Sequence, residues 1–474
     1  MYPLTVIFKK SVNSSIFPGI WKNSFITPIH KNGSKNLINN FRPITIINIF
    51  AKIFESIIHN KLFTYLSSFI IDEQHGSLPK KSITTNLLTY KENIIDSFTN
   101  KNEIYSIYTD VKKAFDSINH KLLIVKLERY GIDTDMLQLL QSHLTNHKQF
   151  VKIHNYKSKE ITVKSGALQG SYLLYIIYVN DCKLVIKHSK TLLYIDDMKI
   201  YKEIKNNDDL KLLNADLNEI CEWNKKNGLD FNESKCKVII FSKNEYEEEN
   251  KFAFKINTKN IEYSNKIKDL GIIFDKNLDF EDHINFIISN SLKSIWLIKH
   301  YGKNFHKKES LIILYNSLVK SKLMFGSTIW SPNTQKVSEK IEKVQHKFLR
   351  FMSFKINKPM DYTDHEYSEI AKELNINTLE SNRIYHDLIL MYKIINNLTN
   401  LDFIKELLKV YTNDRNLRVK ETIFVIPYKY KDINVKSTVY RMILTANNNN
   451  KDIDFFKDNF NQFKLKLDNK IKKY

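Results

Sequence analysis

The chain has 474 residues, of which 42% are hydrophobic and 26% charged, so it can bury several cores and is not a disordered tail. Gly (10) and Pro (8) are scarce, which excludes collagen-like, elastic and Pro-rich linker architectures. Lys and Arg total 73 against 52 acids, a net charge of +21, and only seven of these cations are Arg. Lys suits attraction to a phosphate backbone better than reading of base edges. We therefore expect a polyanionic partner, the alternative being a genome whose composition merely favours Lys.

The cysteines and the apolar runs indicate the kind of compartment. Cys182, Cys221 and Cys236 lack the paired spacing of a disulfide framework or a zinc knuckle, which favours a reducing environment. The first residues lack the apolar run and the cleavage site of a signal peptide. The longest apolar run, residues 172–179, is far shorter than the ~20 residues of a membrane span. We expect a soluble intracellular protein.

In chain order, the first clear elements surround Asp110. Residues 104–109 form a short run of apolar, β-branched and aromatic residues, which predicts a buried strand that ends at Asp110. Apolar residues at helical spacing follow, and they predict a helix that starts near Ser117. Asp116 is the expected cap of that helix.

A second acidic position follows in the next predicted elements. Residues 192–201 predict two short strands around a turn with two acids at its tip. A helix over 210–220 is predicted next, with Asn207 or Asp208 as its cap and Gly228 just beyond its end. Residues 238–241 predict a further strand.

The second half of the chain is predicted to be mostly helical, with helices over 309–325 and 338–352. Strands and helices that alternate up to about residue 275, followed mostly by helix, predict an α+β catalytic body with helical appendages. Residues 440–474 are polar and rich in Lys. They predict either a solvated terminal helix or a tail that touches nucleic acid.

The acids at the two strand ends are the candidate metal site. Taken singly, an Asp at a strand end is usually a cap, and an Asp-Asp pair is usually a solvated turn. Together, Asp110 beside a hairpin that carries Asp196 and Asp197 makes a hard-oxygen site suited to Mg²⁺. Two such ions about 3.5–4 Å apart would activate a 3′-hydroxyl and stabilise a pyrophosphate leaving group. The pattern therefore indicates nucleotidyl transfer, in agreement with the positive charge.

Eight blocks in a fixed order resemble the reverse transcriptases of non-LTR (LINE-type, jockey-like) retrotransposons. They are residues 17–55, 73–88 (EQHGSLPKKSITTNLL), 108–123 (YTDVKKAFDSINHKLL), 165–171 (SGALQGS), 194–197 (YIDD), 228–242 (GLDFNESKCKVIIFS), 268–275 (KDLGIIFD) and 314–332 (LYNSLVKSKLMFGSTIWSP). The resemblance implies a right-hand polymerase fold with fingers and an antiparallel palm sheet at 1–260. It implies a primer-grip hairpin and a helical thumb at 261–350, and a helical C-terminal region at 351–474.

The resemblance also implies the metal and proton-transfer groups. The carboxylates of Asp110, Asp196 and Asp197 and the main-chain carbonyl of Val111 would hold the metal ions. Lys235 is the candidate proton donor to the pyrophosphate, and an exposed lysine at a turn is the open alternative for it.

The resemblance further implies the nucleotide and primer contacts. Lys31 and Arg42 would neutralise the incoming triphosphate. Phe115 would lie under the sugar and exclude a 2′-hydroxyl, the alternative being a core residue. Gln169 and Gly170 would lie against the template and the nucleotide, and Leu270 with Gly271 would form the primer grip.

The activity implied by the resemblance is that of an RNA-directed DNA polymerase. It would extend a DNA primer on an RNA template with deoxynucleoside triphosphates and Mg²⁺, or Mn²⁺ in its place. No membrane partner is expected. The chain begins within the approach to the fingers, so no endonuclease domain is expected in it. Its expected location is the nucleus, a cytoplasmic ribonucleoprotein, or both.

One departure from the family pattern bears on activity. After Ser171 the usual Leu-Gly-Pro is missing, and the segment before Asn180 is about three residues short, close to one helical turn. This predicts a rotated or displaced helix behind the nucleotide pocket. The alternative function is therefore a catalytically inactive, truncated retroelement relic that only binds nucleic acid. A maturase or a telomerase-like polymerase is disfavoured by the sequence WSP at 330–332.

Overall fold

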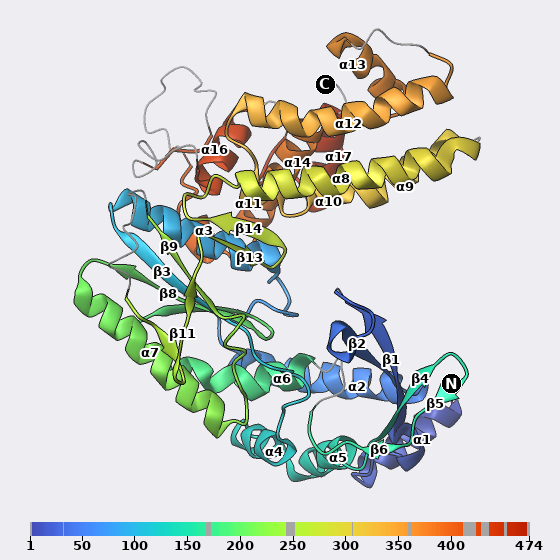
Figure 1. Ribbon diagram of the computed structural model, residues 1–474, viewed down its shortest axis with the longest axis vertical. Helices are drawn as coiled ribbons and strands as arrows, with labels where there is room; N and C mark the ends of the chain where they lie inside the picture. The colour runs from blue at the N-terminus through green and yellow to red at the C-terminus, as the bar shows by residue number, and fades with distance from the viewer. Residues whose placement is uncertain are drawn as a thin grey trace.

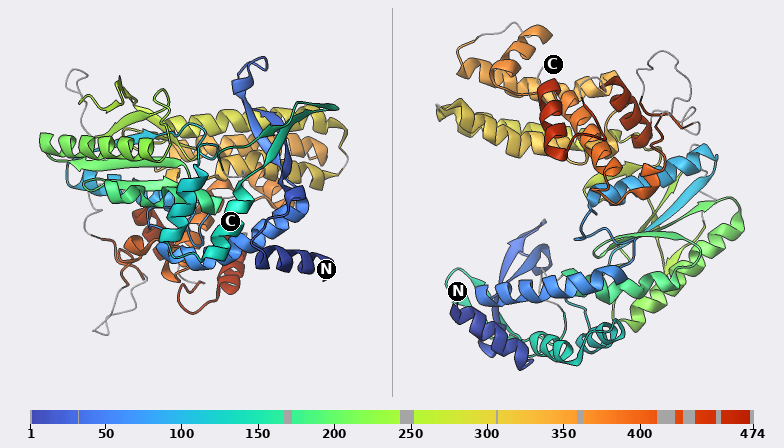
Figure 2. Two further views of the ribbon diagram at one scale, coloured as in Figure 1. Left: turned by 90° about the horizontal axis from the view of Figure 1, so that it is seen from below. Right: turned by 180° about the vertical axis from the view of Figure 1, so that it is seen from behind.

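A computed structural model describes residues 2–31, 33–166, 172–242, 252–305, 307–358, 363–410, 423–427, 436–449 and 453–471. Figure 1 and the rear view in Figure 2 place one sheet and a bundle of helices at opposite ends of the molecule, with a second sheet between them. By analogy with a hand, we call these three parts the fingers, the thumb and the palm. Among the described residues, no helix combines the length and the apolar character that a membrane crossing requires.

The palm sheet has five strands in the order β12-β9-β3-β8-β7. They are β3 (Glu103–Thr109), β7 (Lys190–Tyr194), β8 (Asp197–Ile204), β9 (Lys237–Phe241) and β12 (Glu262–Tyr263). The central strand β3 is antiparallel to both β8 and β9. The strands predicted at 104–109, 192–201 and 238–241 are confirmed.

Both faces of the palm sheet are covered, because alternate residues of β3 join different cores. Ile104 packs in the same apolar cluster as α3 residues, whereas Tyr105 and Ile107 join the cluster of the helices on the other face. The covering helices are α3 (Ile83–Thr99) on the first face, and α6 (Tyr172–Val179) and α7 (Asn207–Lys226) on the second. A short hairpin, β10 (Lys255–Ile256) and β11 (Lys259–Asn260), lies beside α7.

The fingers sheet has the order β2-β1-β4-β5, with β6 paired to β4. Its strands are β1 (Asn23–His30), β2 (Phe41–Ile46), β4 (Lys148–Ile153), β5 (Tyr156–Lys157) and β6 (Ile161–Thr162). The accompanying helices are α1 (Tyr2–Asn13), α2 (Ile49–Leu66), α4 (His120–Arg129) and α5 (Thr134–Leu144). The fingers lie below and to the right of the palm in Figure 1.

The thumb begins with a two-stranded hairpin and continues as helices. The hairpin is β13 (Lys266–Asp269) and β14 (Ile272–Asp275). The thumb helices are α8 (Glu281–Tyr301), α9 (Lys308–Tyr315), α10 (Ser321–Met324), α11 (Ser327–Trp330) and α12 (Gln335–Lys355). The C-terminal helices are α13 (Asp364–Glu373), α14 (Leu379–Ile395), α15 (Asp402–Lys405), α16 (Thr438–Asn448) and α17 (Phe460–Ile471).

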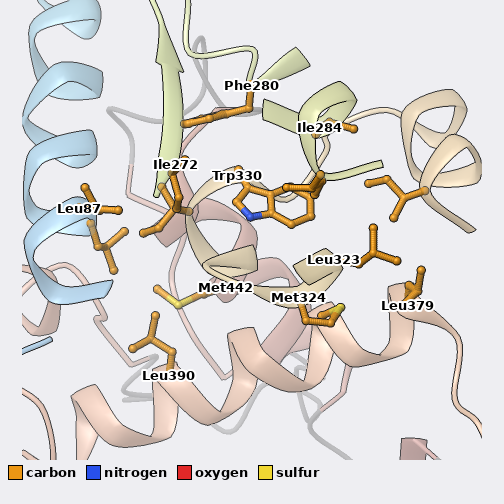
Figure 3. Packing of buried hydrophobic residues seen from close by; sticks show 14 of the residues in the cluster. Leu87, Ile272, Phe280, Ile284, Leu323, Met324, Trp330, Leu379, Leu390 and Met442 are labelled. Atoms are coloured by element: carbon orange, nitrogen blue, oxygen red, sulfur yellow. The ribbon is translucent and has the colours of Figure 1, made fainter. Parts of the chain in front are cut away.

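One apolar cluster joins the palm, the thumb and the C-terminal helices. Figure 3 shows the buried Trp330 surrounded by Leu87 of α3, Ile272 of β14, Leu390 of α14 and Met442 of α16. The indole N–H of Trp330 donates to the carbonyl of Phe325 over 2.7 Å, so its only polar atom is satisfied in the core. The C-terminal helices are therefore packed against the thumb.

Four predicted elements are corrected by the structure. The helix expected from Ser117 begins at His120, and Asn119 caps it by accepting hydrogen bonds from the amides of Lys121 (3.0 Å) and Leu122 (3.2 Å). Asp116 is therefore not the cap, because the side chain of Asn119 lies directly before the helix and binds its first free amides.

The other corrections concern helix boundaries and burial. The helix α7 is capped by Asn206, whose side chain accepts from the amide of Asp209. The helix expected over 309–325 is interrupted by a π-helical segment, Asn316–Lys320. The expected solvated helix after 440 is wrong for α16, because its apolar side is buried in the thumb cluster.

Candidate active site

The palm sheet brings the three candidate carboxylates to one edge. Asp110 directly follows β3, and Asp197 is the first residue of β8. The antiparallel register pairs Thr109 with Met198, so Asp110 and Asp197 are the next opposing positions of the ladder. Asp196 lies in the two-residue turn between β7 and β8, because Tyr194 pairs with Asp197. The three acids thus lie at the same edge of the sheet, and their role as metal ligands stays a prediction.

The carboxylates repel one another, which makes the edge suited to a cation. Desolvation, and then the charges of Asp196, Asp269 and Asp110, raise the pKa of Asp197 to about 6. The pKa of Asp196 is also raised, by desolvation and then by the charge of Asp110. Nearby negative charges disfavour ionisation, so a bound cation would be stabilised by the same field.

Lys235 already partly neutralises this edge. Its ammonium Nζ lies 3.1 Å from Oδ2 of Asp110, although the lysine side chain is 57% exposed. The turn that carries it is tied to the strand end, because the amide of Asn232 donates to the carbonyl of Asp110 over 2.7 Å. Lys235 thus lies beside the acids, and its role as a proton donor stays a prediction.

The donor set fits a hard divalent ion, but the side chains are not gathered into a finished cage. Carboxylate and carbonyl oxygens are the ligands that Mg²⁺ prefers. Within the described ranges, however, no three His, Cys, Asp or Glu side chains are grouped closely enough to hold a metal ion. The ammonium of Lys235 forms an ion pair with the Asp110 carboxylate instead. Val111, the predicted carbonyl ligand, forms an isolated antiparallel bridge with Phe231.

The two predicted phosphate-binding cations lie on the fingers sheet. Arg42 is on β2, opposite Ile29 of β1. Its positive charge partly opposes the rise in the pKa of Asp196, which burial causes first of all. Lys31 directly follows β1, and its amide donates to the carbonyl of Asn40 over 2.8 Å. Both side chains are at the surface. The structure thus brings Arg42 within electrostatic range of the acids and places Lys31 at the end of the neighbouring strand.

Phe115 is half-buried against the helix that lies under the acids. Its ring packs 5.0 Å from the ring of Tyr175 and 5.7 Å from that of Tyr172, centroid to centroid. The charges of Asp196 and Asp197 add to the burial that raises the pKa of Tyr175, so this helix lies close to the carboxylates. Phe115 therefore belongs to the apolar support of the site while part of it remains accessible.

The shortened segment still forms a helix. All residues of α6 from Leu173 to Val179 are buried. Asn180, which follows it, donates to the carbonyl of Phe69 (2.8 Å) and to the hydroxyl of Tyr130 (2.9 Å), and accepts from the amide of Ile71 (3.0 Å). The predicted contacts of Gln169 and Gly170 lie outside the residues that the structure describes.

The predicted primer-grip hairpin adjoins the acids. Leu270 and Gly271 form the turn between β13 and β14, with φ values of 44° and 95°. A cavity of about 70 Å³ is lined by Leu270 and Lys268 of the hairpin on one side and by Asp197 of the palm on the other. The side chain of Lys199 on β8 forms an ion pair with Asp269 of β13, so strand and hairpin are joined under the site.

Two contributors to the site were missed in the sequence. Lys199 is buried between the apolar residues Met198 and Ile200 of β8, and a charge at such a position was an available signal for a buried partner. Gln74, in the block predicted to follow the template, is buried and binds the main chain of the turn that carries Asp196. The three cysteines are free and buried.

Comparisons with known proteins give the family. The sequence profile described as reverse transcriptase (RNA-dependent DNA polymerase) matches residues 29–274, just over half of the chain. The probable RNA-directed DNA polymerase from transposon X-element of Drosophila melanogaster is 24% identical over 365 residues, which cover 74% of this chain and 40% of that protein. The RNA-directed DNA polymerase from mobile element jockey of the same species is 24% identical over 375 residues, with the same coverage of 74% and 40%.

A third relative and a solved structure complete the comparison. The probable RNA-directed DNA polymerase from transposon BS of Drosophila melanogaster is 23% identical and is covered over 42% of its length. Apo telomerase from Candida tropicalis aligns with a TM-score of 0.41 at 14% identity, over 84% of this chain and 70% of that one. This chain therefore spans about 40% of the length of its curated relatives.

The family profile and the strand-end acids lie in the same part of the chain, since residues 29–274 include the whole palm sheet and most of the fingers. The chain belongs to the reverse transcriptase (RNA-dependent DNA polymerase) family.

Proposed function

We propose that this chain is an RNA-directed DNA polymerase that copies RNA into DNA for a non-LTR retrotransposon. The observation that carries the proposal is the meeting of Asp110, Asp196 and Asp197 at one edge of the palm sheet, within range of Lys235 and Arg42. Metal-assisted phosphoryl transfer needs acids that hold metal ions. It also needs basic groups that neutralise the charge of the phosphates. The names of the three relatives, each an RNA-directed DNA polymerase, support the same activity.

The proposed cofactor is Mg²⁺, with Mn²⁺ as an alternative. The carboxylates of Asp110, Asp196 and Asp197 and the carbonyl of Val111 would hold it. Bound there, the ion would polarise the phosphoryl oxygens and make the primer 3′-hydroxyl a better nucleophile. Lys235 would turn from Asp110 toward the leaving pyrophosphate and donate a proton from Nζ.

The proposed nucleotide site lies between the fingers and the palm. Lys31 and Arg42 would compensate the charge of the triphosphate as it moves toward the leaving group. Phe115 would lie under the sugar and exclude a 2′-hydroxyl. Gln169 and Gly170 would contact the template and the nucleotide.

The thumb provides a surface suited to a nucleic-acid backbone. Four exposed lysines follow one side of α12 at a spacing of three or four residues; they are Lys336, Lys340, Lys343 and Lys347. Burial, followed by the charges of Arg350 and Lys347, lowers the pKa of Lys299 on the neighbouring helix α8, so positive charge is concentrated here. We assign the RNA template and the DNA primer as partners, with Leu270 and Gly271 at the primer end. In place of the expected boundaries at 261–350, we propose a thumb from the start of β13 at Lys266 to the end of α12 at Lys355, followed by the C-terminal helical region.

Primer extension tests the proposal. Purified protein would be mixed with an RNA template, a complementary DNA primer, Mg²⁺ and labelled deoxynucleotides, beside an Asp196→Asn/Asp197→Asn control. We expect incorporation by the wild-type protein and at least a 10³-fold loss in the control, the order of effect of removing preorganised electrostatic stabilisation. Salt-sensitive binding of the same duplex without incorporation by the wild-type protein would contradict polymerase activity and leave the inactive relic.

A further inference from the structure

The turn that carries Asp196 has an unusual backbone. Ile195, its first residue, has a φ of 60°, in the left-handed region. A β-branched residue is rare there, because its branched Cβ approaches the backbone, and two-residue hairpin turns normally place Gly or Asn at such positions. The main chain at Ile195 must therefore be held by contacts from elsewhere in the fold.

A buried amide side chain makes those contacts. Gln74 is 1% exposed. Its Oε1 accepts hydrogen bonds from the amide of Ile195 (2.9 Å) and from the amide of Gly76 (2.8 Å). Its Nε2 donates to the carbonyl of Ile195 over 3.4 Å. Both main-chain polar groups of the left-handed residue are thus bound by one side chain that lies 121 residues earlier in the chain.

The segment around Gln74 is fixed against the same hairpin. The amide of Leu193 donates to the carbonyl of Glu73, and the amide of His75 donates to the carbonyl of Leu193, each over 2.9 Å. At Gly76, an added Cβ would lie 2.6 Å from the amide nitrogen of Ile195, which is closer than such atoms approach. The clamp therefore needs a glycine beside the turn, so that the two backbones can meet.

We propose that Gln74 is a positioning residue for the metal-binding acids: its side-chain amide holds Ile195 in the left-handed conformation and thereby aims the Asp196 carboxylate at the edge shared with Asp110 and Asp197. The inference rests on the proposed function only in that the acids hold metal ions. Gln74 touches neither metal nor substrate and acts through the turn. Its alternative role is a fold-stabilising contact without effect on the acids.

A matched pair of variants separates the two roles. Gln74→Met removes the amide at similar volume. The control is Gln345→Met in the thumb core, because Gln345 is 2% exposed and also uses both ends of its amide, accepting from Tyr315 and donating to the carbonyl of Asn377. A second change, Ile195→Gly, removes the reason for the clamp, since glycine adopts positive φ readily.

Three readouts give the expected result. In Gln74→Met, Mn²⁺ binding measured by electron paramagnetic resonance should weaken about 10- to 100-fold, the range seen when a partner that orients metal ligands is lost. Primer extension should fall in kcat by a similar factor with little change in KM. In an Ile195→Gly background the same Gln74→Met change should cost less than about threefold in either quantity. Gln345→Met should leave the Mn²⁺ affinity and kcat unchanged once both are expressed per folded protein.

Amide hydrogen exchange keeps the inference testable whether or not the protein polymerises. The peptide over 193–198 should exchange about tenfold faster in Gln74→Met and unchanged in Gln345→Met, because only the former frees the amide of Ile195. A wild-type protein without primer extension would refute the proposed function alone. Unchanged exchange of this peptide in Gln74→Met would overturn the role of Gln74. If the wild-type protein binds Mn²⁺, an unchanged Mn²⁺ affinity in Gln74→Met would overturn it as well.

Discussion

The ion pair between Lys199 and Asp269 is expected to be the main polar connection between strand β8, which carries Asp197, and the hairpin of β13 and β14. The two side chains are 4% and 6% exposed, so water screens neither charge. The ammonium also lies 4.4 Å from the ring centroid of Tyr90, and Tyr108 donates its hydroxyl to Oδ2 of Asp269 over 3.1 Å. The isosteric change Asp269→Asn would remove the charge and keep the shape.

The magnitude follows from the burial of the remaining charge. Removing one partner of a buried pair costs about 3–5 kcal/mol, because the other is left uncompensated. Asp269→Asn should fall in this range, with the retained hydroxyl bond from Tyr108 offsetting about 1 kcal/mol. In the double variant Lys199→Met/Asp269→Asn no charge remains buried, so we expect a loss of less than about 1.5 kcal/mol. The coupling between the two positions would then exceed about 2 kcal/mol.

Urea unfolding followed by tryptophan fluorescence would measure these differences, because Trp330 packs in the same cluster as Ile272 of the hairpin. Hydrogen exchange of β13 and β14 would show whether the loss is local to the hairpin. An Asp269→Asn protein within 1 kcal/mol of wild type would show that the buried Lys199 charge is not left uncompensated. A double variant as unstable as the sum of the two single changes would show that the two side chains are not coupled.

Three further predictions concern stability. Burial lowers the pKa of His75 to about 3, so the stability that its neutral form contributes is complete above the unfolded pKa of about 6.5. That stability is lost at about 1.4 kcal/mol per pH unit as the pH falls toward 3. Urea titrations between pH 7 and 5 should therefore give a smaller change of unfolding free energy with pH for His75→Gln than for wild type, and an equal change would contradict this. Asn119→Ala should lose about 1 kcal/mol of unfolding free energy and Asp116→Ala almost none, and the reverse order in thermal unfolding would count against Asn119 as the cap. Arg441→Met leaves the buried Asp387 without the two hydrogen bonds that it accepts from Arg441 (2.7 and 3.1 Å), so it should lower the unfolding free energy by about 3–5 kcal/mol and speed proteolysis near 436–449. Resistance to proteolysis equal to that of the wild type would argue against a stabilising role of this ion pair.

Local patterns predicted the palm well. Strand β3 and the hairpin β7–β8 were recognisable because alternation and a short apolar run are properties of neighbouring residues. The placement of Asp110 beside Asp197 followed, since both lie at strand ends. The buried side of α16 was also visible, with Val439, Met442, Ile443 and Ala446 at helical spacing, but the polar composition around it outweighed this signal.

Contacts between residues far apart in the chain could not be predicted from the sequence. The cap of α4 depended on whether Asp116 or Asn119 stood at the first turn, and both residue types cap equally well. Gln74 gave no local sign of its role, because the main chain that it binds lies in another block. The contact of Lys235 with Asp110 likewise joins residues 125 positions apart. Such contacts are set by the packing of strands and helices, which residue patterns alone do not specify.

We propose that the carboxylates at the palm edge catalyse nucleotide transfer. Single-turnover incorporation of a labelled deoxynucleotide on an RNA template tests this role, with Asp110→Asn beside the wild-type protein. We expect incorporation by the wild-type protein and a loss of about 10²- to 10³-fold in Asp110→Asn, with duplex binding and thermal unfolding unchanged. Equal incorporation by both proteins would contradict this role of the acids.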